Sequence, residues 1–181
     1  MLKEKKEASV AQVMTRRKIL KAVCCAGAVA AVSSVALDKA GAALSGRTYP
    51  QVKIANIKNL PSGKTIKFDY PLTGRKNILV NLGCSAEGGA GADKSIVAYS
   101  MFCTHLGCAV DLDKESGMLV CECHQSIYDP KQSGKVVEGP APNNLPMILL
   151  EIDKNGDIYA AGVAGLIYGL RNNLLDGEEI K

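Results

Sequence analysis

From about position 50 onward, hydrophobic and polar side chains alternate over short distances, as is typical of β-strands. Two segments, 52–57 and 65–70, alternate between apolar and polar positions, whereas 77–82 and 95–100 are mostly apolar. Alternation indicates a strand with one buried face, and a short apolar run is consistent with a strand buried on both faces. We therefore expect a β protein in which the two apolar segments lie nearer the core.

Turn residues divide the rest of this region into hairpins. Segments 147–152 and 157–160 flank Asp153–Gly156, which predicts a tight hairpin, and 111–117 has the composition of another turn. No segment before the C-terminal tail has a helical period. The pattern predicts an all-β, antiparallel domain. The tail, 163–175, is either a short helix or an extended segment, apolar enough to pack on its own domain or on a partner.

The N-terminal residues have a different pattern from the rest. Basic side chains precede an apolar run of small residues at 22–37, and Ala40-Gly41-Ala42 offers a cleavage site, so 1–42 is predicted to be an export signal. Thr15–Lys21 resembles a twin-arginine motif, which implies export of a folded protein to the periplasm. An uncleaved membrane anchor is the alternative, but the run is shorter than the roughly 20 residues needed to span.

The positive charge of the chain belongs to this signal. The chain has 22 Lys and Arg against 18 Asp and Glu, a net charge of +4. Eight of the basic and three of the acidic residues lie in 1–42, so 43–181 has 14 basic and 15 acidic side chains, a net charge of −1. The composition therefore gives no support to nucleic-acid binding. Residues 43–181 have the length of one domain.

Both histidines of the chain stand beside cysteines, in Cys103-Thr-His105 and Cys121-Glu-Cys-His124. Two thiolates and two imidazoles form a ligand set for a metal centre. Structural zinc usually takes wider ligand spacings than C-x-H. In one type of [2Fe–2S] cluster, two thiolates bind one iron and two imidazoles bind the other. One Cys and one His in each loop suits that cluster, with Cys103 and Cys121 on one iron and His105 and His124 on the other. A zinc-stabilised binding module is the alternative.

Two further cysteines, Cys108 and Cys123, occupy equivalent places after the two halves of this ligand set. A disulfide between them would tie the two loops together, and an oxidising compartment would permit it. Cys84 is left over in a β-rich stretch, which predicts a buried free thiol, and the odd cysteine count leaves open a role at an interface. Cys24 and Cys25 fall within the predicted signal.

Cys103-Thr-His-Leu-Gly-Cys108 and Cys121-Glu-Cys-His-Gln-Ser126 resemble the two cluster-binding boxes of Rieske proteins. Two positions depart from the usual second box, since Glu122 replaces Pro and Gln125 replaces Gly. Gly139-Pro-Ala-Pro142 resembles the proline loop of that family. The resemblance implies a Rieske fold, in which a cluster-binding subdomain, about 101–143 here, is inserted into an antiparallel β base domain.

In the same family, the positions of Ser126 and Tyr128 resemble hydroxyl donors to a bridging sulfide and to a cysteine sulfur. Such hydrogen bonds stabilise the reduced cluster and raise its potential. The resemblance therefore implies a potential in the upper part of the Rieske range, which runs from about −150 to about +300 mV.

Beyond these boxes, the chain resembles the small Rieske subunit of arsenite oxidase, notably in 87–93, 124–130, 144–146, 155–159 and 162–169. This resemblance implies a non-catalytic electron-transfer subunit bound to a large molybdopterin subunit that oxidises arsenite. A periplasmic cytochrome c or cupredoxin would accept the electrons. The Rieske subunit of a related molybdoenzyme, such as an iodate reductase, or of a quinol-oxidising cytochrome bc complex, is the alternative within the family.

Overall fold

A computed structural model of the chain describes residues 48–175 and 180. The export signal predicted over 1–42 lies outside the described residues, as do Cys24 and Cys25. In the described part of the chain, no helix has both the length and the hydropathy to cross a membrane.

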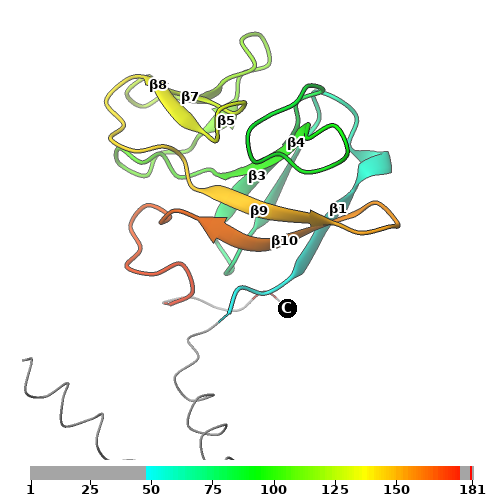
Figure 1. Cartoon of the computed structure of the whole chain (residues 1–181). Coiled ribbons are helices and arrows are strands. Elements are labelled where there is room, and N and C mark those ends of the chain that lie inside the picture. The colour runs from blue at the N-terminus through cyan, green and yellow to red at the C-terminus, as the bar shows by residue number, and fades with distance from the viewer. Residues whose placement is uncertain (1–47, 176–179, 181) are drawn as a thin grey trace, which may run out of the picture. The chain divides into compact units, whose positions relative to one another are not determined.

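The larger sheet has six antiparallel strands in the order β1-β10-β9-β4-β3-β2 (Figure 1). All six segments predicted as strands are present; five have ends within one residue of those expected, and the sixth, expected at 157–160, extends to Ala164. A short 3₁₀ helix, η1 (Ile57–Asn59), follows β1. The strands are β1 (Val52–Asn56), β2 (Thr65–Asp69), β3 (Lys76–Asn81), β4 (Ile96–Ser100), β9 (Met147–Ile152) and β10 (Asp157–Ala164).

The smaller sheet has four antiparallel strands in the order β5-β6-β7-β8 and is inserted between β4 and β9 (Figure 1). Its strands are β5 (Asp111–Leu112), β6 (Leu119–Cys121), β7 (Ser126–Asp129) and β8 (Lys135–Glu138). The turn predicted near 111–117 connects β5 to β6. The prediction of an all-β protein with a subdomain inserted into a base sheet is confirmed.

Strands β3 and β4 are buried on both faces, as their apolar sequences predicted. Ile78 and Tyr99 contribute to a core shared with the smaller sheet, whereas Leu79 and Ala98 contribute to a core on the opposite face. Tyr99 also donates a hydrogen bond to the carbonyl of Pro130, 2.8 Å away, at the end of β7. The inserted sheet is therefore fixed to the base by packing and by a buried hydrogen bond.

The C-terminal tail packs on its own domain. Strand β10 extends to Ala164, and no helix follows it in residues 165–175. Ile167 is buried, and its backbone N–H donates a hydrogen bond to the side-chain carbonyl of Asn173 at 2.9 Å. Leu166, Tyr168 and Leu175 remain exposed.

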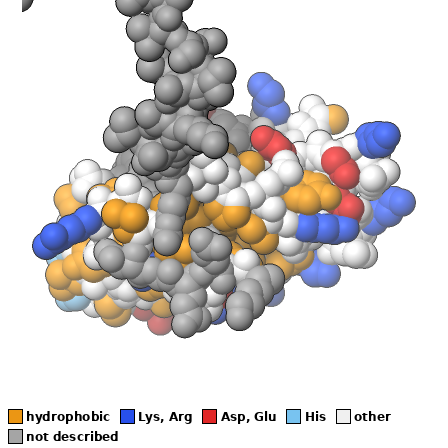
Figure 2. Space-filling model, turned by 90° about the horizontal axis from the view of Figure 1, so that it is seen from below, with side chains coloured by type: hydrophobic (Ala, Val, Ile, Leu, Met, Phe, Trp, Pro, Cys, Tyr) orange, Lys and Arg blue, Asp and Glu red, His pale blue; other side chains and the backbone are white. Residues whose placement is uncertain are grey.

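Seen from below, the domain shows hydrophobic side chains in the middle and at the left, with charged side chains gathered at the right (Figure 2).

The prediction for Cys84 was wrong, because this free cysteine is exposed. It lies beyond the end of β3, where Gly83 has a φ of +67° and turns the chain out of the sheet. The apolar run therefore ends before the cysteine, and the thiol has no core to enter.

Candidate metal centre

The first Cys/His loop, Cys103–Cys108, is a closed turn. The backbone N–H of Cys103 donates to the carbonyl of Cys108, and that of Gly107 donates to the carbonyl of Cys103, each at 2.8 Å. Cys103 is buried and His105 is half-buried, whereas Leu106 is exposed. The turn therefore directs the cysteine inward and leaves the histidine at the boundary with solvent.

The second Cys/His loop, Cys121–Gln125, joins β6 to β7. Cys121 ends β6 and is buried, while residues 122–125 are all exposed. Gln125 has a φ of +57°, in the left-handed region that favours glycine. This conformation reverses the chain into β7.

A disulfide joins the two loops through Cys108 and Cys123, whose Cα atoms are 6.5 Å apart. The pairing expected from their equivalent positions is therefore present. The sulfur of Cys121 lies within 4.8 Å of both sulfurs of this bond. Because the disulfide sulfurs have no thiolate to offer a metal, this group of three cysteines is not itself a metal site.

The loops bring the two predicted cysteine ligands together and the two predicted histidine ligands together. The rings of His105 and His124 are 4.7 Å apart between centroids and nearly perpendicular, at 88°. A single tetrahedral zinc needs four ligand atoms within about 4 Å of one another. Among the described residues, these four form no group of ligand atoms within 4.8 Å of one another. The geometry does not favour a mononuclear zinc site.

Cys103 and Cys121 differ in their electrostatic surroundings. Burial raises the pKa of the Cys103 thiol, but hydrogen bonds with Tyr128 and with the backbone N–H of His105 outweigh burial and hold the pKa below its ordinary value. Burial, followed by the neighbouring Cys103, raises the pKa of Cys121. Ionisation of both thiols would place two negative charges side by side, and a bound metal cation would offset their repulsion.

Tyr128 and Ser126 place hydroxyl groups beside these sulfurs. The Tyr128 Oη lies 3.1 Å from Cys103 Sγ and accepts a hydrogen bond from the N–H of Thr104 at 3.2 Å. Burial, followed by the hydrogen bond with Cys103, raises the pKa of Tyr128 to about 12, so its hydroxyl is protonated at neutral pH. Ser126 is fully buried; it lies near enough to Cys103 to help lower the pKa of that thiol, but its Oγ makes no hydrogen bond of regular geometry.

Buried polar groups without partners are rare and require an explanation. Besides Ser126 Oγ, His105 Nδ1 is buried and has no partner. A metal–sulfur centre between the loops would satisfy both atoms, the imidazole nitrogen by coordination and the hydroxyl by a hydrogen bond to sulfur. The residues present therefore fit such a centre.

The proline loop, 139–142, forms a third wall against the second Cys/His loop. A Cβ at Gly139, whose φ is +88°, would lie 2.5 Å from the carbonyl oxygen of Gln125 and from Cα of Ser126. Only glycine permits so close a backbone approach. The loop predicted from its prolines thus depends equally on this glycine.

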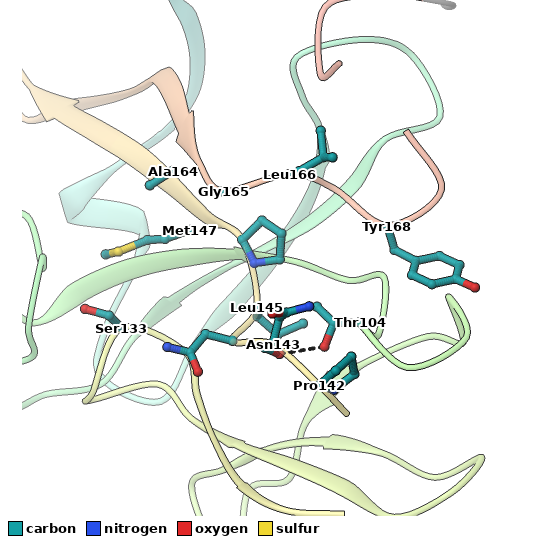
Figure 3. Close-up of a pocket in the computed structure, with 12 residues that line it drawn as sticks. Thr104, Ser133, Pro142, Asn143, Leu145, Met147, Ala164, Gly165, Leu166 and Tyr168 are labelled. Atoms are coloured by element: carbon teal, nitrogen blue, oxygen red, sulfur yellow. Dashed lines mark hydrogen bonds between the residues drawn. The ribbon is translucent and has the colours of Figure 1, made fainter. Parts of the chain in front are cut away.

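Two contacts of the first Cys/His loop were not foreseen in the sequence. Thr104 Oγ1 donates to the carbonyl of Asn143 at 2.6 Å, as the dashed line in Figure 3 shows. The ring of Tyr168, from the tail, covers Gly107, where a Cβ would lie 2.7 Å from the ring. Thr104, Asn143 and Tyr168 also line an open pocket of about 800 Å³. In the sequence, these contacts were indicated only by a hydroxyl residue, Thr104, between two predicted ligands and by an aromatic residue, Tyr168, in the tail.

Comparison with known proteins identifies the family of the chain. Residues 51–149 match the family described as the Rieske [2Fe-2S] domain. "Iodate reductase subunit IdrB" of Denitromonas iodatirespirans is 40% identical over 128 residues, which cover 69% of each chain. The cytochrome bc1 complex Rieske iron-sulfur subunit of Corynebacterium diphtheriae is 42% identical over 66 residues, 36% of this chain and 16% of that protein.

Among solved structures, the soluble domain of the Rieske protein II (soxF) from Sulfolobus acidocaldarius superimposes with a TM-score of 0.61 and 32% sequence identity. The superposition covers 71% of this chain and 84% of that chain.

Proposed function

The chain belongs to the Rieske [2Fe–2S] family, and we propose that it passes electrons between a large molybdopterin subunit and a periplasmic electron carrier. It is an electron-transfer subunit that carries one Rieske [2Fe–2S] cluster. The observation that supports the proposal best is the pairing of two buried cysteines with two histidines at the solvent boundary. When bound, the cluster takes up and releases one electron at a time.

In this proposal, Cys103 and Cys121 ligate one iron, and His105 and His124 ligate the other. The cysteines would hold the cluster on its buried side, and the imidazoles would hold it on the side that a redox partner can approach. Tyr128 donates a hydrogen bond to Cys103 Sγ, and Ser126 would donate one to a cluster sulfur. Both bonds stabilise the more negative, reduced state, so they place the potential in the upper part of the range of about −150 to about +300 mV.

Arsenite is the substrate that we propose for the large subunit. Its oxidation would release electrons that enter this chain and leave to a cytochrome c or a cupredoxin. The support is the resemblance to the small subunit of arsenite oxidase, which includes the 162–169 segment. That segment contains Tyr168, which covers the first Cys/His loop.

Iodate reduction is the second candidate, because an iodate reductase subunit matches more than two thirds of this chain. Electrons would then flow in the opposite direction, from the carrier through this chain to the large subunit. The match to a bc1 subunit covers little more than a third of the chain and supports the cluster rather than that complex.

We further propose that residues 1–42 direct export by the twin-arginine route and that 43–181, with the cluster-binding part at about 101–143, is the periplasmic domain. The disulfide between Cys108 and Cys123 agrees with an oxidising compartment.

The test is the EPR signal of the reduced cluster in the complex purified with its large subunit. If the partner oxidises arsenite, arsenite added to the oxidised complex produces the signal, as does ascorbate. If it reduces iodate, iodate removes the signal from the ascorbate-reduced complex, and arsenite has no effect. If neither anion changes a signal that ascorbate produces, both substrates are wrong and the electron-transfer role remains.

A further inference from the structure

The second Cys/His loop contains a residue that glycine would suit better. Gln125 has a φ of +57°, and a side chain in the left-handed region costs free energy that glycine does not pay. Gln125 is also exposed, so burial of its side chain does not offset this cost. We therefore expect a specific contact of the Gln125 side chain to offset the free-energy cost of this backbone conformation.

That contact spans the loop. Gln125 Nε2 donates a hydrogen bond to the carbonyl of Glu122 at 3.0 Å, which links the two ends of the exposed segment 122–125. His124 and the disulfide cysteine Cys123 lie between the linked residues. A glycine at 125 could adopt the turn but could not form this link.

The backbone of Gln125 is fixed on its other side. Gly139 approaches so closely that a Cβ there would lie 2.5 Å from the Gln125 carbonyl oxygen. The proline loop thus holds the main chain of Gln125, and the side chain of Gln125 holds the carbonyl of Glu122. The ring of His105 contacts that of His124 edge-on, with 4.7 Å between centroids, but residues 122–125 are all exposed.

We propose that Gln125 is a positioning residue for His124: its side-chain amide closes the second Cys/His loop and fixes the orientation of that imidazole. The inference rests on the proposed ligation of iron by His124. The perpendicular arrangement of the His105 and His124 rings is the geometry that the link preserves. Loss of the link changes the iron–nitrogen interaction at His124 and leaves that at His105 unchanged.

The experiment compares Gln125→Met and Gln125→Gly in the full-length chain carrying its cluster. Methionine keeps the length of the side chain without a donor, and glycine removes both the donor and the strain. Gln132→Met is the matched control, because Gln132 is also exposed and its Nε2 donates to Asp129 Oδ2, in the turn after β7. Pulsed EPR of the reduced cluster resolves the couplings of the two histidine nitrogens, and the decay of the cluster's visible absorbance at a fixed elevated temperature measures cluster release.

We expect both Gln125 variants to change one nitrogen coupling and keep the other, and to release the cluster on the order of five times faster than the wild type. Gln132→Met should match the wild type in both measurements. Unchanged couplings in the Gln125 variants would overturn the proposal, even if their melting temperature falls, because a merely structural role lowers the melting temperature alone. A wild-type spectrum without two nitrogen couplings would instead overturn the proposed ligand set.

Discussion

The first Cys/His loop is held by the rest of the molecule, whereas the second is held mainly by its own residues. Tyr168 of the tail covers Gly107, and Thr104 is hydrogen-bonded to Asn143, so the first loop is fixed from two distant segments. The second loop exposes residues 122–125 and is closed by the bond from Gln125 to Glu122. It also contacts the backbone of Gly139 and is joined to the first loop by the disulfide and by the contact between the two histidine rings.

This difference suggests a division of roles between the two histidines. His105 is half-buried and its Nδ1 is enclosed, so its position depends on tertiary packing. His124 is exposed, so a redox partner could approach its ring directly. A rigid loop beside an accessible one would keep the cluster in place while leaving one imidazole open to the partner.

Removal of the disulfide by Cys108→Ser should have the largest effect, because it separates the second loop from the first. The bond joins residues 15 apart, and a disulfide closing such a loop stabilises a protein by about 3 kcal/mol. Chemical denaturation should show a loss of this order, together with faster cluster release. Cys84→Ser, which changes an exposed free cysteine, is the control and should have no effect. Equal stability of the two variants would contradict the anchoring role of the disulfide.

Truncation of Tyr168 to Ala should loosen the first loop and leave the second unchanged. The ring is partly exposed, so the expected loss is about 2 kcal/mol, less than for a fully buried aromatic side chain. Denaturation measures the loss, and hydrogen exchange of the amides at 103–108 and 121–125 locates it. Leu166→Ala, in the same tail and more exposed, should change stability by less than about 0.5 kcal/mol. Faster exchange in both loops would show that they are not held independently.

Replacement of Tyr128 by Phe should lower the reduction potential by about 60 mV, equivalent to about 1.4 kcal/mol for a one-electron couple. The hydroxyl lies 3.1 Å from Cys103 Sγ, and its loss removes a hydrogen bond that favours the reduced state. A redox titration followed by EPR gives the value. Tyr99→Phe removes a hydroxyl bonded to Pro130 instead, so the potential should stay unchanged. If the two variants have the same potential, Tyr128 does not tune the cluster.

Replacement of Thr104 by Val should have the smallest effect, about 1 kcal/mol of stability. The change keeps the shape of the side chain and removes its hydrogen bond to the Asn143 carbonyl and its 3.2 Å contact with Tyr128 Oη. Thermal denaturation of the cluster-loaded chain measures the loss, and Thr104→Ser, which keeps the hydroxyl, should restore most of it. If Ser is no better than Val, the methyl group rather than the hydrogen bond connects the first loop to the proline loop.

Alternation, short apolar runs and a turn signal together predicted the six strands of the base sheet, because each strand has one buried face, is buried on both faces or flanks a tight turn. Strand β3, for example, places Ile78 and Leu79 in opposite cores. The strands of the inserted sheet were harder to predict individually. They have two to four residues each, so their ends depend on pairing with neighbours rather than on a repeating pattern. Cys84 shows the same limit of prediction from sequence, because its exposure depends on the turn at Gly83 and not on the pattern of the residues around it.

The sequence by itself determined the candidate ligands, the disulfide partners and the family, because these depend on residue type and spacing along the chain. Only the tertiary structure decided how the two loops are held. Tyr168 is more than 60 positions from Gly107, and Thr104 is nearly 40 from Asn143, and no local pattern encodes such contacts. Even Gln125, visible in the sequence as a departure from glycine, acquired a role only when its φ and its bond to Glu122 were known. Spacing selects the chemistry of the site, whereas packing between distant segments fixes its geometry.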